Sequence, residues 1–303
     1  MENFRLKVFR TVAEKLNFRQ AAEALYLTQP AITLQIKALE EELGVQLFNR
    51  SGNRIALTDA GKILFTHARR MAALVMAAQA EMGRFKGEER GELRIGASTT
   101  IAQYVLPRLL GDFQLAQPGI RLSVLGANTA VIVSGVLDGS LALGLIEGPS
   151  LRRDLKIERF LADEIGVITP AHHEWGGQVI SAEQVSKEKL ILREDGSGTR
   201  RVVEAALRRA GVRLKRANIV MVLDSTEAIK SAVETGLGIG FVARRAIQKE
   251  LKLGTLNELT VQGMKIERHF SIVLPRGPEP AGPAGAFLLF LRAVRKSVME
   301  EGS

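Results

Sequence analysis

The chain has 303 residues, 46% hydrophobic and 25% charged, an ordinary globular composition over about two domains that excludes collagen-like, low-complexity and largely disordered proteins. Without cysteine it can hold no disulfide or thiolate metal site. Because it has neither a long apolar run nor a signal-like N-terminus, we expect a cytoplasmic protein without a membrane span. The net charge of +9 favours a polyanionic partner, and residues 1–90, with 14 basic and 10 acidic residues, are more densely basic than the remainder, as in a small nucleic-acid-binding module.

Residues 2–43 carry the pattern of three helices. The first has one apolar face, and the second, from Arg19 to Leu25, is rich in alanine, so another helix can cross it closely. Thr28 is a good N-cap and Gly44 a good C-terminal stop. These signals predict a third helix over residues 29–43.

The third predicted helix has an apolar face for the core and an opposite face that is polar and basic near its start. That opposite face consists of Gln29, Pro30, Thr33, Leu34 and Lys37. Three glutamates, residues 40–42, follow at the other end. Such a helix is suited to entering a DNA groove N-terminus first, because its carboxylates then stay away from the phosphates. A three-helix bundle with a solvated outer face is the alternative.

Residues 47–58 form two short extended runs around a Ser-Gly-Asn turn, which predicts a β-hairpin. Arg50 lies at the base of the hairpin and Arg54 at its tip. A hairpin directly after a helix-turn-helix is a winged arrangement, in which arginines reach phosphate oxygens or the minor groove. We predict that Arg54 makes such a contact and that Thr33 contacts a base edge.

A long series of residues at fixed spacing resembles the DNA-binding end of LysR-type transcriptional regulators. It covers residues 1 to about 65 and includes the motifs Ala21-Ala22-x-x-Leu25, Thr28-Gln29-Pro30-Ala31, Leu43-Gly44 and Leu57-Thr58-x-Ala60-Gly61. The resemblance implies a winged helix-turn-helix domain over residues 1–58 and binding to double-stranded DNA. Leu34 departs from the pattern, because many members carry a polar residue there. An apolar contact to a thymine methyl group fits a leucine at this position.

A long helix is predicted from Thr58, which can cap it, and residues 59–90 form a linker. Its apolar residues follow a heptad seam of alternating spacings four and three. The seam consists of Leu64, Ala68, Met71, Val75, Ala78, Met82 and Phe85. Such a seam predicts pairing with a second helix, the alternative being burial against the same chain. The resemblance implies a homodimer through this helix and a homotetramer through further contacts.

From residue 91 strands and helices alternate, which predicts α/β lobes with parallel sheets. Among the expected segments are a helix over 101–116 and a strand over 164–169. The resemblance implies an effector-binding domain over 91–303, made of two Rossmann-like lobes as in periplasmic binding proteins. Lobe 1 then covers about 91–162 and 268–303, and lobe 2 about 163–267, with crossovers near Ala162 and Arg268.

Two strand-to-helix junctions are rich in hydroxyl groups and free amides, which are suited to binding an anion. The first is Ser98-Thr99-Thr100, and the second is the string from Arg193 to Arg200, with Gly196, Ser197, Gly198 and Thr199 between them. The candidate effector-binding set also includes Thr129, Glu147 and Thr169. The alternative for either junction alone is ordinary helix capping. If both act together, they clamp one small oxyanion from facing lobes.

The Arg-Glu-x-Gly-Ser-Gly-Thr-Arg string is similar to a subgroup of the family whose members respond to sulfur-assimilation signals or carbon-fixation metabolites. We therefore expect a small oxyanion or a phosphorylated metabolite as effector. Gly236-Leu-Gly-Ile-Gly240 precedes a strand instead of following one, so it predicts no dinucleotide site. His172-His173-Glu174 lies in a predicted loop without ligand-spaced partners. We expect no cofactor, metal or catalytic residue.

These patterns predict a ligand-responsive DNA-binding regulator and not an enzyme. Two alternatives remain, a cytoplasmic α/β enzyme with an N-terminal dimerisation bundle and a solute-binding protein. The winged motif and the absence of a linked acid, base and nucleophile count against the enzyme. The lack of an export signal counts against the solute-binding protein.

Overall fold

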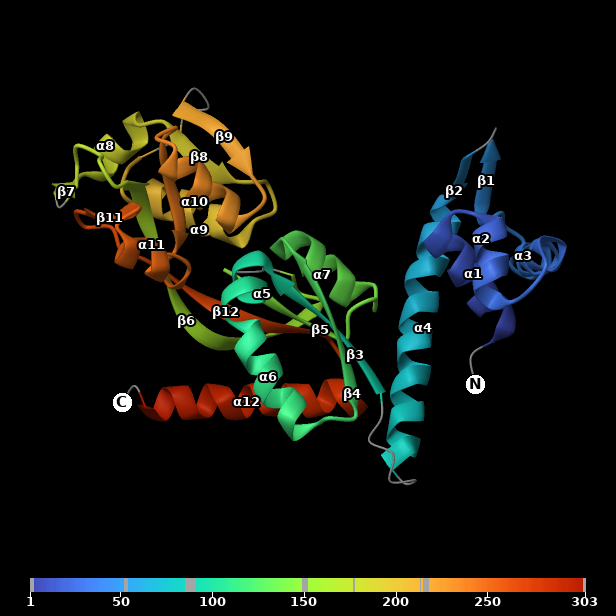
Figure 1. Cartoon of the computed structure of the whole chain (residues 1–303). Coiled ribbons are helices and arrows are strands. Elements are labelled where there is room, and N and C mark those ends of the chain that lie inside the picture. Colours follow the sequence, from blue (N-terminus) through green and yellow to red (C-terminus); the bar gives the residue numbers. More distant parts are fainter. Residues whose placement is uncertain are drawn as a thin grey trace. The chain divides into compact units, whose positions relative to one another are not determined.

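A computed structural model of the chain describes residues 3–51, 54–84, 91–148, 152–176, 178–212, 214 and 218–301 (Figure 1). These residues form two compact units. One unit consists of residues 1–90 and 138–140, and the other of the rest of the chain. Each unit has its own hydrophobic clusters.

The first unit begins with three helices, α1 (Phe4–Lys15), α2 (Phe18–Leu25) and α3 (Gln29–Leu43). The third has the bounds that its caps predict. The Thr28 hydroxyl accepts a hydrogen bond from the Ala31 amide, and Gly44 ends the helix in the left-handed conformation. The helix-turn-helix predicted from the sequence is therefore present.

The predicted hairpin follows as β1 (Phe48–Ser51) and β2 (Arg54–Leu57), paired antiparallel. Glu40, one of the three glutamates at the end of α3, does not lie free at the helix end as expected. The Glu40 carboxylate accepts hydrogen bonds from the backbone amides of Leu47 and Phe48, at 2.8 and 3.3 Å. Glu40 therefore fastens the hairpin to α3 instead of lying free at the helix end.

The long helix is α4 (Asp59–Arg84), and the Thr58 hydroxyl caps it through the Gly61 amide. The residues of its predicted seam differ in burial. Leu64 and Ala68 pack into the hydrophobic core of the first unit. Among the described side chains of α4, the large apolar ones that face solvent form another stripe, about 100° wide, of Ile63, Met71, Leu74 and Met82, which are 64%, 49%, 66% and 56% exposed. Phe85 lies outside the described residues.

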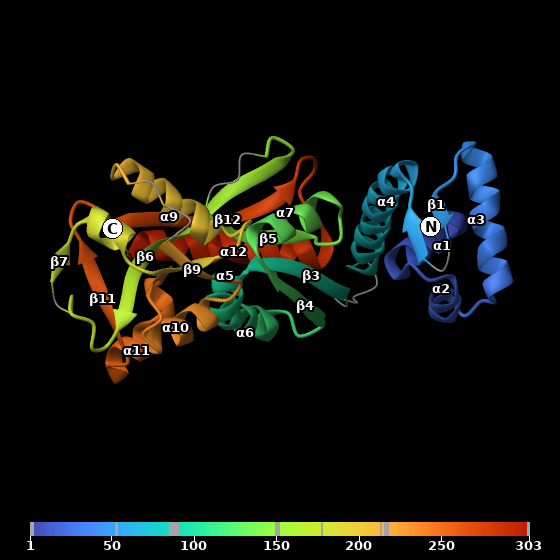
Figure 2. The same ribbon diagram turned by 90° about the horizontal axis from the view of Figure 1, so that it is seen from above.

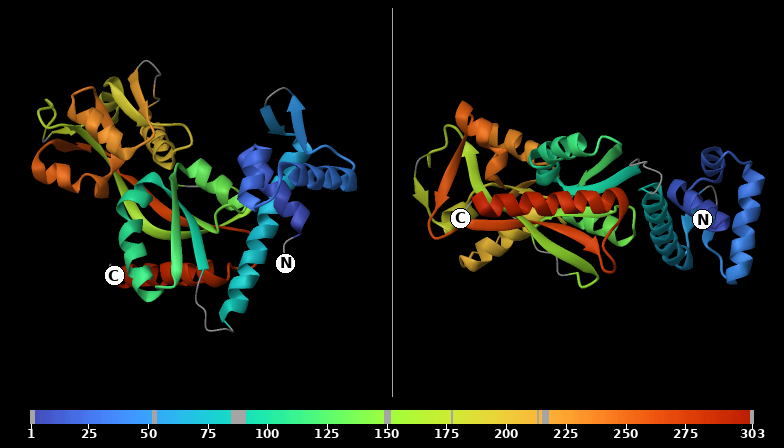
Figure 3. Two further views of the ribbon diagram at one scale, coloured as in Figure 1. Left: turned by 45° about the vertical axis from the view of Figure 1, so that its right-hand side comes forward. Right: turned by 90° about the horizontal axis from the view of Figure 1, so that it is seen from below.

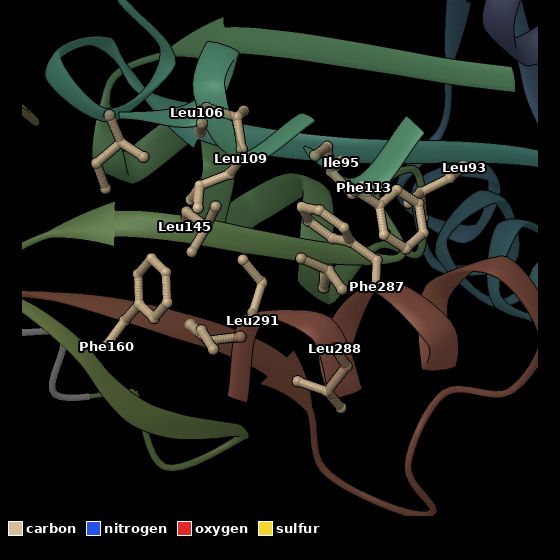
Figure 4. Close-up of a cluster of buried hydrophobic side chains, with 14 of the residues drawn as sticks. Leu93, Ile95, Leu106, Leu109, Phe113, Leu145, Phe160, Phe287, Leu288 and Leu291 are labelled. Carbon is tan, nitrogen blue, oxygen red and sulfur yellow. The ribbon is translucent and has the colours of Figure 1, made fainter. Parts of the chain in front are cut away.

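Lobe 1 of the second unit contains β3, β4 and β5 with helices on both faces. Its elements are β3 (Gly91–Ser98), α5 (Thr99–Tyr104), α6 (Leu106–Ala116), β4 (Ile120–Ala127), α7 (Thr129–Leu137), β5 (Leu143–Glu147) and α12 (Gly282–Glu301). Figure 4 shows the core between α6, α12 and the strands, where Phe113 and Phe287 meet edge to face. The C-terminal helix α12, red in Figure 3, thus belongs to the lobe that begins at residue 91.

Lobe 2 contains the elements between the two crossover strands. They are β7 (Val179–Ile180), α8 (Ala182–Lys187), β8 (Leu190–Arg193), α9 (Gly198–Arg209), β9 (Ile219–Leu223), α10 (Thr226–Glu234), β10 (Ile239–Ala243), a 3-10 turn (Arg244–Ala246), α11 (Gln248–Leu253) and β11 (Leu256–Val261). Strand β8 lies parallel to both β9 and β10. The second unit therefore has two lobes of similar construction, each with its own core.

Two long strands, β6 (Leu155–Pro170) and β12 (Ile266–Pro275), run through both lobes and pair antiparallel with each other. The main sheet path is β4-β3-β5-β12-β6-β10-β8-β9. The sheet is therefore mixed, whereas the alternation of elements predicted parallel sheets. Pairing of the two crossover strands with β5 and β10 is antiparallel, because each strand carries the chain from one lobe to the other.

Two predicted segments differ in extent. The helix expected over 101–116 is divided into α5 and α6, because Pro107 lacks the amide that a continuous helix needs and instead occupies the first turn of α6. The strand expected over 164–169 is the second half of β6. The first half of β6 contains charged residues and is half-exposed on lobe 1. The residues there therefore do not show the apolar pattern by which a buried strand is predicted.

Candidate functional site

The outer face of α3 is the first candidate site. Gln29, Pro30, Leu34 and Lys37 are exposed, and together with the half-buried Thr33 they line one open hollow on the protein surface. Figure 2 shows α3 on the side of the first unit away from α4. The structure thus brings together all five residues that the sequence predicts on the outer face of this helix.

Thr33 differs in detail from the prediction. Its hydroxyl donates a hydrogen bond to the Gln29 carbonyl, at 3.0 Å, one helical turn earlier. The hydroxyl proton is therefore already used, and the side chain offers its methyl group and an acceptor lone pair. Leu34, which is 65% exposed, adds a second apolar surface beside it.

Arg50 and Arg54 lie on the two strands of the hairpin. Arg54 pairs with Ser51 in the last pair before the turn, and Arg50 pairs with Ile55 one position further back, so Arg50 lies nearer the tip than expected. The side chains of these two arginines lie outside the described residues. Their predicted contacts with phosphate or minor groove remain predictions.

The second candidate site lies where the lobes of the second unit meet. Ser98 ends β3, Glu147 ends β5 and Arg193 ends β8, so the carboxyl ends of strands from both lobes are involved. Arg268 lies on the crossover strand β12. We call the meeting point of Ser98, Glu147, Thr199 and Arg268 the lobe junction.

Glu147 is the centre of the lobe junction and is 1% exposed. One carboxylate oxygen accepts a hydrogen bond from the Thr100 backbone amide of lobe 1, at 2.7 Å. The other accepts from the Thr199 hydroxyl of lobe 2, also at 2.7 Å, and from Arg268 at 2.8 Å. The two predicted anion-binding segments therefore converge on a carboxylate of the chain itself.

This environment keeps Glu147 ionised. Burial by itself raises the pKa of a carboxyl group, and it is the largest single influence here. The Arg268 guanidinium and the hydrogen bonds from Thr199 and Thr100 together outweigh it and hold the pKa of Glu147 below its ordinary value of 4.5. The lobe junction thus contains a fixed negative charge at neutral pH.

Arg268 joins this carboxylate to the hinge between the lobes. Its Nε donates to Asp163, at 2.7 Å, and Asp163 also accepts a hydrogen bond from Arg245 at 2.7 Å. Asp163 and Arg268 are direct partners in the β6–β12 register. The Nη2 of Arg268 is buried and has no hydrogen-bond partner among the described residues.

Several of the predicted hydroxyl groups form hydrogen bonds within the chain. Ser98 and Thr129 hydroxyls are hydrogen-bonded to each other at 3.1 Å, and both also contact the Glu147 backbone. Ser197 accepts from the Arg200 amide as the cap of α9. The helix capping that the sequence left as an alternative is thus present for Ser197, whereas the Ser98 side chain makes no cap hydrogen bond.

The predicted glycines permit close contacts within the chain. A Cβ on Gly198 would lie 1.9 Å from the Glu147 carbonyl oxygen, so only glycine lets α9 approach the end of β5. Gly196 adopts a φ of +89°, and its carbonyl accepts from the Ala130 amide of lobe 1. The second junction therefore contacts lobe 1 directly.

The two predicted arginines of this string are both held by neighbouring acidic groups. Arg193 donates to Thr99 of lobe 1 at 3.2 Å and pairs with Glu194 at 2.8 Å. Arg200 pairs with Asp195 and Glu204. Both cations lie close to the lobe junction with their charges balanced.

Thr169 is the one member of the predicted effector set that lies elsewhere. Strand β6 runs antiparallel to β10, so Thr169 lies opposite the start of β10. Arg193 is the last residue of β8, which runs parallel to β10, so Arg193 lies at the opposite end of these strands, near the lobe junction. The partner of Thr169 in β11 is Asn257. Its position along β6 thus places Thr169 away from the lobe junction, and its role in effector binding stays a prediction.

Sequence reasoning missed Asp163, Arg245 and Arg268 as members of the site. The available signal was a pair of opposite charges, Asp163 and Arg268, at the two predicted crossovers near Ala162 and Arg268. Strand pairing places them side by side.

The weaker sequence motifs have structural roles. His173 accepts a hydrogen bond from the Trp175 amide and packs against the Trp175 ring. Within the described ranges, no cluster of His, Asp and Glu that could hold a metal ion is found. Gly238 and Gly240 lie at the start of β10, where side chains would clash with neighbours. No helix in the described part of the chain is long and apolar enough to cross a membrane.

Comparison with protein-family models gives two matches that together cover most of the chain. Residues 4–62 match the bacterial regulatory helix-turn-helix model of the lysR family. Residues 86–296 match the LysR substrate binding domain. The chain therefore has the two domains, in the order, that the sequence motifs indicate.

Similar proteins agree with these matches. The transcriptional regulator CbbR of Rhodospirillum rubrum is 35% identical, over 96% of this chain and 96% of that protein. The RuBisCO operon transcriptional regulator of Allochromatium vinosum is 33% identical, over 94% of each chain. Among solved structures, the CcmR regulatory domain of Synechocystis PCC6803 in complex with 2-PG is 30% identical with a TM-score of 0.63, over 68% of this chain and 98% of that domain.

Proposed function

The chain belongs to the LysR family of DNA-binding transcriptional regulators, and we propose that a small anionic effector bound at the lobe junction controls its binding to promoter DNA. Residues 1–58 are the proposed DNA-binding domain, residues 59–90 the dimerisation helix, and residues 91–303 the effector-binding domain. The protein is a regulator and not an enzyme.

One observation carries the proposed effector site. Donors from both lobes, the Thr100 amide and the Thr199 hydroxyl, converge on the buried Glu147 carboxylate. A site that stabilises an internal carboxylate has the donor set that an acid group of a small molecule needs. The relatives support the same chemical class, because the CcmR regulatory domain was solved with 2-PG.

The effector class that we propose is a small oxyanion or a phosphorylated metabolite. One donor at the junction is available in addition to those that Glu147 occupies. Arg268 Nη2 is buried without a hydrogen-bond partner among the described residues. An anion with several oxygens can use this donor together with the Thr100 amide and the Thr199 hydroxyl, which favours sulfur and phosphorus oxyanions.

The effector site is tested by calorimetry on the full chain with sulfate, phosphate and phosphoglycolate. We expect one site per chain, and we expect Thr100→Ala and Thr199→Ala each to weaken binding by about tenfold, the loss for one good hydrogen bond. Thr100→Ala keeps the backbone amide that binds Glu147 and removes only the side-chain hydroxyl. In the double variant the two losses should not add, because both groups serve one ligand.

The same two variants should differ in folding stability, and this difference provides a control for the binding measurement. Thr199→Ala removes a donor from a buried carboxylate and should destabilise the effector-binding domain by about 1–3 kcal/mol. Thr100→Ala leaves the backbone amide on Glu147 in place and should cost less than Thr199→Ala. Anion binding that both substitutions leave unchanged would place the effector away from the lobe junction.

The DNA-binding face is tested by a matched pair of substitutions on α3. Thr33→Ala removes a candidate base contact, so we expect altered preference among operator sequences, by about 1–3 kcal/mol at one base pair. Lys37→Ala removes an exposed charge, so we expect uniformly weaker binding and a smaller salt dependence. Gel shifts on the promoter region of the chain's own gene and on single-base variants measure both. Equal footprints and affinities for wild type and both variants would contradict this assignment.

A further inference from the structure

The cations at the lobe junction are already paired within the described part of the chain. Their pairs are Arg268 with Glu147 and Asp163, Arg245 with Asp163, Arg193 with Glu194, and Arg200 with Asp195 and Glu204. An anionic effector therefore meets no uncompensated positive charge there. An added negative charge in a buried place is costly unless an internal carboxylate gives up its position.

Among these carboxylates, Glu147 alone contacts the threonines of both lobes. Asp163 is bound by the two arginines Arg245 and Arg268. Glu194 contacts its neighbour Arg193. Only an exchange at Glu147 frees the Thr100 amide and the Thr199 hydroxyl together.

We propose that Glu147 is an internal competitor of the anionic effector, and that the effector's acid group binds by displacing the Glu147 carboxylate from Thr100 and Thr199. The inference rests on the proposed effector site. It adds that the site is filled by the chain's own carboxylate before the effector arrives. Glu147 thereby determines which anions bind, because only an anion that replaces its hydrogen bonds can displace it.

The exchange also connects effector binding to the arrangement of the lobes. Glu147 ends β5 of lobe 1, Thr199 begins α9 of lobe 2, and Arg268 lies on the crossover strand. When the carboxylate leaves, the bond that joins the lobes through Glu147 is replaced by bonds through the ligand. The unpartnered Nη2 of Arg268 offers a further donor to a ligand oxygen without breaking any existing contact.

Competition of this kind lowers the apparent affinity for the effector. The apparent affinity is the intrinsic affinity multiplied by the fraction of molecules in which Glu147 does not occupy the donors. Glu147→Gln keeps the size of the side chain and one oxygen but removes the charge, so it competes more weakly. We expect sulfate and phosphate to bind the Glu147→Gln variant of the full chain at least tenfold more tightly than wild type, by calorimetry. Glu183→Gln is the control, because it removes the same charge from an exposed position on α8 and should change affinity less than twofold.

The outcomes separate this inference from the proposed site. Equal or weaker binding by Glu147→Gln, with wild type binding one anion, overturns the competitor and leaves the effector site standing. An equal gain in Glu183→Gln also overturns it, because net charge then explains the effect. No binding by any protein overturns the anion site and the competitor together.

A second variant covers the case in which Glu147→Gln does not fold. Glu147→Asp keeps the charge, but its side chain is one methylene shorter and cannot reach Thr100 and Thr199 at once. We again expect tighter binding of sulfate and phosphate than in wild type. Unchanged or weaker binding by this variant overturns the competitor.

Discussion

Substituting Arg268 by methionine should destabilise the effector-binding domain by about 3–5 kcal/mol, the largest loss of folding stability that we expect from a single change. The reason is that Glu147 and Asp163, each with a side chain no more than 2% exposed, would lose the cation that both share. Arg268→Lys should recover part of this loss, since one ammonium keeps the charge but does not present the planar fork that reaches both carboxylates.

Arg244→Met is the matched control for this prediction. Arg244 also pairs with two carboxylates, those of Glu164 and Glu258, but its side chain is 49% exposed, so we expect a cost of at most about 1 kcal/mol. Urea unfolding followed by the fluorescence of Trp175, the single tryptophan, reports on lobe 2. Equal costs for both substitutions would show that burial of the Arg268 pairs is not what stabilises the domain.

Substituting Leu74 by glutamate should dissociate the oligomer that α4 is proposed to form. Leu74 lies in the exposed stripe with Ile63, Met71 and Met82, and in a two-fold interface each residue occurs twice. Losing two buried leucines at about 1.5–3 kcal/mol each gives a dissociation constant at least a hundredfold higher, before any repulsion between the new charges. Sedimentation velocity over a concentration series measures the change.

The neighbouring residue provides the control. Ala73 is also exposed, but it points about 100° away from Leu74 around the helix. Ala73→Glu adds the same charge to the same helix and should leave the oligomer intact. The heptad pattern instead predicts the strongest effect at Val75, so comparison of Leu74→Glu with Val75→Glu distinguishes the exposed stripe from the predicted seam. An oligomer that survives Leu74→Glu would reject the stripe.

The difference between the exposed stripe and the predicted heptad seam illustrates how far a periodic pattern can be interpreted. Spacings of four and three identify α4 as amphipathic, and they do so correctly. They do not say which apolar residues the chain itself buries. Leu64 and Ala68 pack under the helix-turn-helix, so the centre of the exposed stripe lies about 40° from the centre of the heptad seam.

The sequence by itself determined the features that depend on neighbours in the chain. Caps such as Thr28 and Thr58, the end at Gly44 and the hydroxyl-rich junctions at Ser98–Thr100 and Ser197–Thr199 are local, and the structure contains each where the residues indicate it. Local hydrogen bonds and backbone preferences decide them within about one helical turn. The family resemblance over residues 1–65 rests on the same short-range signals.

Only the tertiary structure decided which groups meet at the proposed effector site. Arg268 lies 105 residues from Asp163 and 121 from Glu147, and Thr199 lies 52 residues from Glu147. No local propensity encodes such pairs, because strand order and register bring them together. The same register moves Thr169 away from the junction and makes the sheet mixed. The sequence identified the donors for an anion, whereas the packing of two lobes around the crossover strands gave those donors to Glu147.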